Sequence, residues 1–146
     1  MSIVPANPAQ SMALAFMQAL WAGDVETTDR LFAPDARWVF QYGMPQAQGS
    51  DGRVWPARDA LARVIADLFG KFDPAGFVVT PTSLIGDGDL VAIEYQARGR
   101  TSRGLEYHNT YVTVLSIAGD HVLEIRPYND TAHMLAMLGG DEERTA

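Results

Sequence analysis

The sequence predicts one α+β domain in which a strongly curved, antiparallel or mixed sheet wraps around helices into a cone with an internal pocket. Apolar residues recur at helical spacing in the first half of the chain, where only one strand interrupts them. Four consecutive stretches in the second half are typical of strands joined by tight turns, and an apolar helix follows the last of them. Sequential hairpins form an antiparallel sheet, whose apolar face the helices must cover. A bent sheet that helices close in this way encloses a pocket.

The first helix is predicted from apolar residues between Met12 and Leu20. Asn7 is a suitable cap for it, Pro8 fits its first turn, and Gly23 ends it. An asparagine side chain can accept a backbone N–H at the start of a helix, and proline lacks an N–H that the first turn does not use. The sequence therefore defines both ends of this helix.

A second, shorter helix is predicted over residues 25–32, where Asp24 provides a cap and Pro34 follows the end. Residues 36–43 then read as a strand with Trp38, Phe40 and Tyr42 on one face. A loop rich in glycine, proline and glutamine is expected from Gly43 to Pro56.

The remaining elements follow from apolar periodicity and from turn residues. Apolar residues between Leu61 and Phe72 predict a third amphipathic helix. The run Gly-Asp-Gly-Asp at 86–89 is a strong hairpin signal. The expected strands cover residues 77–85, 90–100, 105–117 and 122–129, and the last helix runs from near Asp130 to Gly139–Gly140.

Length and composition indicate a single globular domain over residues 1–146, with mobile ends at about 1–7 and 140–146. The formal net charge is −7 and no cluster of lysine or arginine occurs, so nucleic acid is an unsuitable partner. No apolar run reaches the roughly 20 residues that span a membrane, which predicts a cytoplasmic protein. The chain has no cysteine, and its three histidines are too scattered to form a metal site.

Several motifs occur in an order that resembles the nuclear transport factor 2-like superfamily, which includes SnoaL-like polyketide cyclases, ketosteroid isomerase and limonene epoxide hydrolase. The matching stretches are AFMQALWAGD, LFAPDARW, DLFGKF, GDGDLVAIEY and GDHVLEIRPYND. The resemblance covers nearly the whole chain and is closest in motif order to limonene epoxide hydrolase and the SnoaL-like cyclases. It implies the cone-shaped fold, but a fold alone does not determine a function.

The residues do not match two of the chemistries found in that superfamily. The resemblance places the five working positions of the epoxide hydrolases at Trp38, Phe40, Tyr95, Ala97 and Pro127, where none of the required residues is retained. These side chains supply neither a base nor the groups that hold a water in line for attack.

The residues that ketosteroid isomerases use as acid and base are not matched either. Their base falls at Phe40 and their tyrosine at Phe16, and the stretch from Tyr111 to Thr113 lacks the second acid.

The polyketide cyclases of the superfamily imply catalytic candidates on the last two strands. These are Asp130 as the acid or base and His108 as its partner, with Asn109 as a polar neighbour. Two structural alternatives remain open. Asp130 precedes a helix and is a preferred cap, and His108 can face away from the pocket, since a slip of one residue changes the face of every side chain in a strand.

The resemblance also implies a pocket that is aromatic and apolar, with a few neutral hydrogen-bonding groups. Such a pocket suits a small hydrophobic, oxygenated molecule. The ligand-binding residues expected there are Met17, Leu20, Trp38, Phe40, Leu68, Phe72, Tyr95, Asn109, Tyr111, Pro127 and Asn129. Which of His108 and Asn109, and which of Asn129 and Asp130, face the pocket depends on the strand register.

Three functional hypotheses follow. The first is an isomerase, cyclase or dehydratase that works by proton transfer without metal or organic cofactor. The second is a non-catalytic binding protein with the same pocket, which the missing acids favour, and the third is a dimeric accessory domain. A homodimer is expected through the strand face that carries His108, Thr110, Val112 and Val114, which have the opposite parity to Asn109.

Overall fold

A computed structural model describes residues 3–49, 52–67 and 69–138 of the chain. The helices are α1 (Pro8–Trp21), α2 (Val25–Leu31), α3 (Ala57–Asp67) and α4 (Thr131–Leu138), with short 3₁₀ turns η1 (Pro45–Gln48) and η2 (Phe69–Lys71). The strands are β1 (Phe32–Val39), β2 (Val54–Pro56), β3 (Val78–Ile85), β4 (Leu90–Arg100), β5 (Glu106–Ala118) and β6 (His121–Asn129). Of the ends predicted to be mobile, 1–2 and 140–146 lie outside the described residues.

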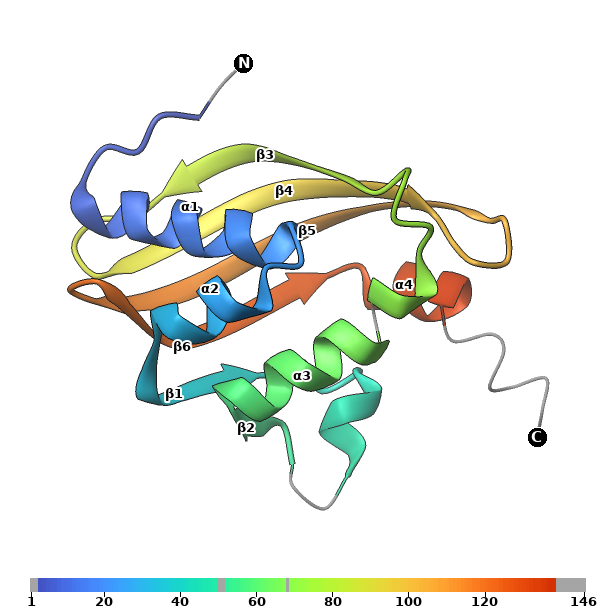
Figure 1. Cartoon of the computed structure of the whole chain (residues 1–146), viewed down its shortest axis with the longest axis horizontal. Helices are drawn as coiled ribbons and strands as arrows, with labels where there is room; N and C mark the ends of the chain where they lie inside the picture. The colour runs from blue at the N-terminus through green and yellow to red at the C-terminus, as the bar shows by residue number, and fades with distance from the viewer. Residues whose placement is uncertain (1–2, 50–51, 68, 139–146) are drawn as a thin grey trace.

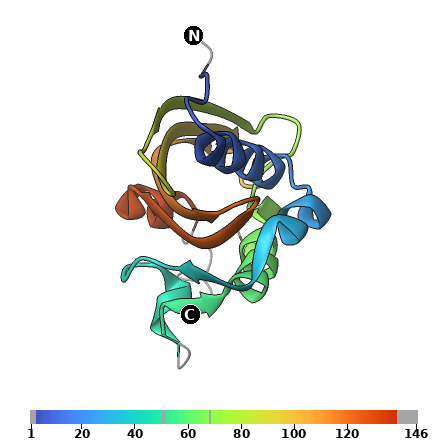
Figure 2. The ribbon, with the colours of Figure 1, turned by 90° about the vertical axis from the view of Figure 1, so that its left-hand side faces the viewer.

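The strands form one mixed sheet in the order β2-β1-β6-β5-β4-β3. Strands β3 to β6 are joined as consecutive antiparallel hairpins, as predicted, whereas β1 runs parallel to β6. The sheet curls strongly, and α1 lies across the long hairpin strands while α3 lies beside β1 and β2 (Figures 1 and 2). The predicted α+β cone is confirmed. Within the described parts of the chain, the helices are all too short or too polar to cross a lipid bilayer.

The start of α1 is tied to the first hairpin of the sheet. Asn7 caps the helix by accepting the N–H of Gln10 at 2.9 Å, and Pro8 occupies the first turn. The Gln10 side chain then donates to the backbone oxygen of Gly86 at 3.0 Å. Within the hairpin, Gly86 allows the two strands to approach closely, because a Cβ there would lie 2.3 Å from the Leu90 backbone oxygen. The Gln10 hydrogen bond therefore joins the start of α1 to this tight turn.

The strand predicted at 36–43 lies four residues earlier, at Phe32–Val39. It begins early because its parallel pairing with β6 starts at Phe32, and an irregularity before Arg37 accommodates Pro34, which has no N–H to pair. Tyr42 does not share the inner face as predicted. It lies beyond the strand and is 75 % exposed, with the Arg53 guanidinium 4.1 Å from its ring centroid.

The third helix ends at Asp67, so the prediction that it continues to Phe72 is wrong. The chain turns through η2 instead, and Phe72 forms an isolated bridge with Thr101. Part of the predicted loop is also ordered, because β2 pairs with β1 through Val39 and Val54. Three residues are too few to show the alternation that identifies a strand.

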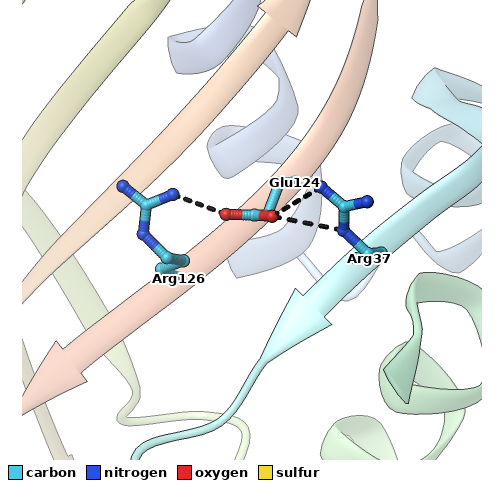
Figure 3. A network of polar contacts seen from close by, with 3 residues as sticks. All are labelled: Arg37, Glu124 and Arg126. Carbon is cyan, nitrogen blue, oxygen red and sulfur yellow. Dashed lines mark hydrogen bonds and ion pairs between the residues drawn. The ribbon is translucent and has the colours of Figure 1, made fainter. Parts of the chain in front are cut away.

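An ion-pair network on the outer side of the sheet joins the two parallel strands (Figure 3). Glu124 of β6 lies between two guanidinium groups: it accepts from Arg37 of β1 at 2.9 Å, and from Arg126 on its own strand. The hydrogen bond from Arg126 is the largest cause, and that from Arg37 a further one, that lowers the pKa of Glu124. The Glu124 side chain is 16 % exposed, so solvent screens these pairs less than it screens a fully exposed pair.

We expect Glu124→Gln to lower the free energy of unfolding by about 1 kcal/mol at pH 7, because the amide cannot hold both guanidinium groups as an anion does. A carboxylate whose pKa is lowered on folding stabilises the protein above its unfolded pKa, and this contribution is lost as pH falls through the folded pKa. The difference between wild type and variant should therefore shrink in urea titrations as pH falls below about 4.5.

The matched control is Glu106→Gln, which removes the carboxylate from a fully solvated pair with Arg100 at 3.6 Å. That change should have almost no effect at any pH. If the free energy of unfolding of wild type and of Glu124→Gln differed by the same amount from pH 7 to pH 3, the ionised Glu124 carboxylate would not be the stabilising group.

Candidate functional site

The sheet and the helices enclose a cavity whose volume, measured for the centre of a water molecule, is about 90 Å³. A site that holds one water needs roughly 10–15 Å³ on this measure, so the cavity has room for several waters or for one small organic molecule. Its wall is formed by α1, α3 and α4, the inner face of β1 and β3–β6, the segment between β1 and η1, and η2.

The lining residues are mostly aromatic and aliphatic, and in the described parts of the chain they include no acidic, basic or histidine side chain. They are Met17, Leu20, Trp21, Trp38, Phe40, Gln41, Met44, Val64, Phe69, Phe77, Val79, Tyr95, Ala97, Tyr111, Thr113, Ile125, Pro127, Asn129 and Met134. Moving an isolated charge into such a wall is strongly unfavourable, so the cavity suits an uncharged molecule.

Most of the residues predicted to bind a ligand line this cavity. They are Met17, Leu20, Trp38, Phe40, Tyr95, Tyr111, Pro127 and Asn129. Their common position follows from strand parity: Tyr95 lies opposite Tyr111 across β4 and β5, and Tyr111 lies opposite Asn129 across β5 and β6. The strand register, which the sequence left open, therefore places Asn109 rather than His108 and Asn129 rather than Asp130 on the inner face.

Of the predicted pocket residues that the structure describes, Phe72 and Asn109 do not line the cavity. Leu68 lies outside the described residues. Phe72 is buried but packs against the rings of Phe77 and Tyr107, with centroids 4.8 and 5.1 Å away, because the helix that was expected to carry it ends earlier. Asn109 is 4 % exposed and faces inward beyond the end of the cavity.

Asn109 organises a buried polar cluster next to the cavity. Its amide donates to the Tyr107 hydroxyl at 2.8 Å and to the backbone oxygen of Asp130 at 3.2 Å. The Tyr107 hydroxyl in turn lies 2.5 Å from that of Tyr111, and the Tyr107 ring stacks on His133 with centroids 5.5 Å apart. These contacts connect the end of the cavity to the start of α4.

His108, a predicted catalytic residue, lies on the outer face of the sheet. It is exposed, and its Nε2 lies 2.9 Å from the Gln96 side-chain oxygen on the neighbouring strand. Strand alternation places it on the opposite side of β5 from Asn109 and Tyr111. The structure therefore gives His108 no contact with the cavity.

Asp130, the other predicted catalytic residue, caps the last helix. Its carboxylate accepts the N–H of His133 at 3.1 Å, and its backbone oxygen accepts the N–H of Met134 at 3.0 Å. It is exposed and does not line the cavity. Of the two readings that the sequence left open for Asp130, the geometry is that of the cap.

Tyr95 and Tyr111 are the titratable groups that line the cavity. Their rings stack 5.1 Å apart, and the Tyr95 hydroxyl pairs with that of Thr113 at 2.9 Å. Burial raises the pKa of Tyr95 to about 12, against the effect of the Thr113 hydrogen bond. Burial also raises the pKa of Tyr111, and the neighbouring Tyr107 raises it further. Both phenols therefore keep their protons at neutral pH and are not available as bases.

Eleven of the described lining residues were not predicted as ligand contacts: Trp21, Gln41, Met44, Val64, Phe69, Phe77, Val79, Ala97, Thr113, Ile125 and Met134. For some, the sequence carried a signal. Trp21 lies one helical turn after Met17, and Thr113 has the strand parity of Tyr111. Gln41 and Met44 belong to an irregular segment that has no periodicity, so only the folded chain shows that they reach the cavity.

A metal centre is not apparent in the described residues, where no three histidine, cysteine or acidic side chains are grouped. The candidate site is thus an apolar cavity with neutral polar groups at some positions of its wall.

We expect Tyr95→Phe to lower the free energy of unfolding at pH 7 by about 1 kcal/mol, because the buried Thr113 hydroxyl loses its partner. The raised pKa of Tyr95 adds a pH dependence. A phenol with a raised folded pKa stabilises the protein below its unfolded pKa of about 10, and this contribution is lost as pH rises towards 12. In chemical denaturation from pH 9 to pH 12, wild type should lose stability faster than the variant.

Tyr42→Phe is the control for the pH 7 effect, since its phenol is 75 % exposed, and it should change the free energy of unfolding by less than about 0.5 kcal/mol. Parallel alkaline curves for wild type and Tyr95→Phe would show that Tyr95 is not held protonated by the fold.

Comparison with known proteins gives a consistent fold. The wild-type protein IdmH from Streptomyces antibioticus, for which a polyketide cyclase activity has been proposed, is similar with a TM-score of 0.75 and 24 % identity over 91 % of this chain and 99 % of that one. TerC, crystallised with polyporic acid, has a TM-score of 0.74 and 19 % identity over 91 % and 99 % of the two chains. A SnoaL-like protein from Jannaschia sp. CCS1 has a TM-score of 0.72 and 16 % identity over 94 % and 96 %.

No curated protein sequence matches the chain at a significant level. A family model described as the SnoaL-like domain does match, over residues 13–125. This match spans α1 to the middle of β6 and so contains most of the sheet and of the cavity wall. The chain therefore belongs to the SnoaL-like domain family, within the nuclear transport factor 2-like fold.

Proposed function

We propose that this protein binds a small, uncharged, hydrophobic and oxygenated molecule in the cavity. The observation that carries the proposal is the composition of the wall, which is largely aromatic and aliphatic and has no ionised side chain among the described residues. Small-molecule sites commonly have such walls, with a few polar groups that orient the ligand.

The size of the cavity limits the ligand to about one or two rings. The waters that would fit in the cavity occupy on the order of 200 Å³ as liquid, and this is the volume available to a ligand. The stacked rings of Tyr95 and Tyr111, with Trp21 4.8 Å from Tyr95, offer a flat aromatic surface on one side. The crystallisation of the structural neighbour TerC with polyporic acid supports a ligand-binding role for a fold of this shape.

Binding is better supported than catalysis by proton transfer. An isomerase, cyclase or dehydratase without a cofactor needs a group that removes a proton from the substrate. Asp130 caps α4 and His108 lies on the outer face, so neither meets the cavity. The two tyrosines that do meet it can donate hydrogen bonds but hold their own protons.

A thermal-shift and tryptophan-fluorescence screen with neutral one- and two-ring compounds tests the proposal. We expect at least one to raise the melting temperature of wild type, with saturable quenching of the cavity tryptophans. Ala97→Leu, which fills the cavity at a fully buried lining position, should weaken that binding at least about tenfold.

Ala92→Leu makes the same change on the same strand, but its side chain is on the opposite face. This control should bind like wild type. A wild type that binds no compound in the screen, or equal binding by both leucine variants, would show that the cavity is not the site.

We also propose that the protein forms a homodimer through the outer face of the sheet. The face carries half-buried Val112 and Val114, next to exposed polar residues such as Gln96 and Thr110. When a second copy covers a partly apolar face, apolar surface is removed from water and the free energy falls.

Light scattering at micromolar concentration should give twice the 15.9 kDa chain mass for wild type. Val114→Lys should give the mass of one chain, because a charge would be buried in the interface. Val4→Lys, at a residue that is 79 % exposed near the N-terminus, should leave the dimer intact. A single-chain mass for wild type would remove this proposal.

A further inference from the structure

The hydroxyl groups in the cavity wall form hydrogen bonds within the protein. The Tyr95 hydroxyl pairs with that of Thr113 at 2.9 Å, and the Tyr111 hydroxyl pairs with that of Tyr107 at 2.5 Å. Each pair uses one of its two O–H donors, so these hydroxyls are only partly engaged within the protein, whereas the groups described next have no partner at all among the described residues.

Buried polar atoms of three lining residues have no hydrogen-bond partner among the described residues: the indole N–H groups of Trp21 and Trp38 and the side-chain oxygen of Asn129. Trp38 is 3 % exposed. Asn129 donates its amide to the Met134 sulfur at 3.5 Å, and only its oxygen is unpaired. Gln41 also lines the cavity, and its side-chain amide is half-buried rather than fully buried. An unpaired buried polar group costs about 1–3 kcal/mol, which a suitable ligand can recover.

Gln41 and Asn129 lie at the same end of the sheet, about 10 Å beyond Trp38 along the strand direction. Strands β1 and β6 run parallel, with Trp38 opposite Ile125. Asn129 is the last residue of β6, four positions after Ile125, and Gln41 follows Trp38 by three positions. With roughly 3.3 Å per residue, Gln41 and Asn129 are at nearly the same level along the two strands.

The free groups include both donors and an acceptor, and none is charged. The Trp38 indole and the Gln41 amide can donate, while the Asn129 oxygen can only accept. A hydroxyl group meets both needs, since it donates one hydrogen bond and accepts others. A carboxylate would leave the Asn129 oxygen unpaired, and it would have to enter a wall without a cation to balance it.

We propose that Gln41 and Asn129 form a neutral hydrogen-bonding subsite that selects phenols or alcohols over the parent hydrocarbon and over charged analogues. The inference rests on the proposed ligand-binding function and adds the class of ligand and its orientation. The hydroxyl lies at the Gln41 and Asn129 end, and the apolar body of the ligand lies against the rings of Tyr95 and Tyr111.

Three probes of nearly equal shape test the subsite at pH 7: naphthalene, 2-naphthol and 2-naphthoate. Titration followed by tryptophan fluorescence should show 2-naphthol binding about tenfold more tightly than naphthalene, which corresponds to one or two hydrogen bonds. Naphthoate should bind at least about tenfold more weakly than 2-naphthol because of its charge.

Two variants assign the preference to the subsite. Gln41→Leu and Asn129→Leu should each reduce the preference for 2-naphthol over naphthalene, and leave the affinity for naphthalene within about twofold. Because Asn129 also contacts Met134 of α4, the Gln41 variant provides a test that does not alter that helix. Gln46→Leu is the matched control, since it removes a half-buried amide of the same segment that does not line the cavity, and it should keep the full preference.

The outcomes separate this inference from the function on which it rests. If wild type binds none of the three probes, the ligand-binding proposal itself fails. If wild type binds naphthalene and 2-naphthol equally, binds naphthoate as tightly as 2-naphthol, or keeps its preference in both leucine variants, the cavity binds ligands but the neutral subsite is wrong.

Discussion

The parallel pairing of β1 with β6 is the contact on which the cavity depends. The four hairpin strands form one continuous unit through local turns, but β1 joins them from a distant part of the sequence. Its pairing places Trp38 beside Ile125 and brings Phe40 to the wall opposite the helices. Arg37, Glu124 and Arg126 hold the pair together on the outer side, so one face of these strands provides the link and the other provides the wall.

Most hydroxyl groups in the cavity wall form hydrogen bonds with other residues of the protein. The Tyr95 hydroxyl pairs with Thr113 and the Tyr111 hydroxyl with Tyr107, while burial raises the pKa of both phenols. The described lining residues include no carboxylate or histidine, and they offer a large aromatic surface. Under the proposed binding function, the polar groups at one end would orient a ligand, because the rest of the wall is apolar.

The positions of Asp130 and His108 in the structure show why a family resemblance alone is a weak guide to chemistry. Both residue types occur where relatives place working groups, but Asp130 is used to start a helix and His108 is on the outer face of its strand. A carboxylate before a helix lowers the free energy of that helix whatever the function of the protein. The same position therefore serves stability in this chain, and the cavity end next to it is organised by Asn109 instead.

The sequence by itself determined the α+β class and the long hairpin strands, because periodicity and turn residues act locally, whereas the pairing of β4, β5 and β6 decided which residues of the last two strands face inward. Tertiary structure alone decided the early start of β1, the short strand β2 and the end of α3 before Phe72, since each depends on pairing between distant segments. It also brought Gln41 and Met44 to the cavity from a segment without periodicity. Which polar groups remain free is likewise a tertiary property, because a hydrogen-bond partner can come from any part of the chain.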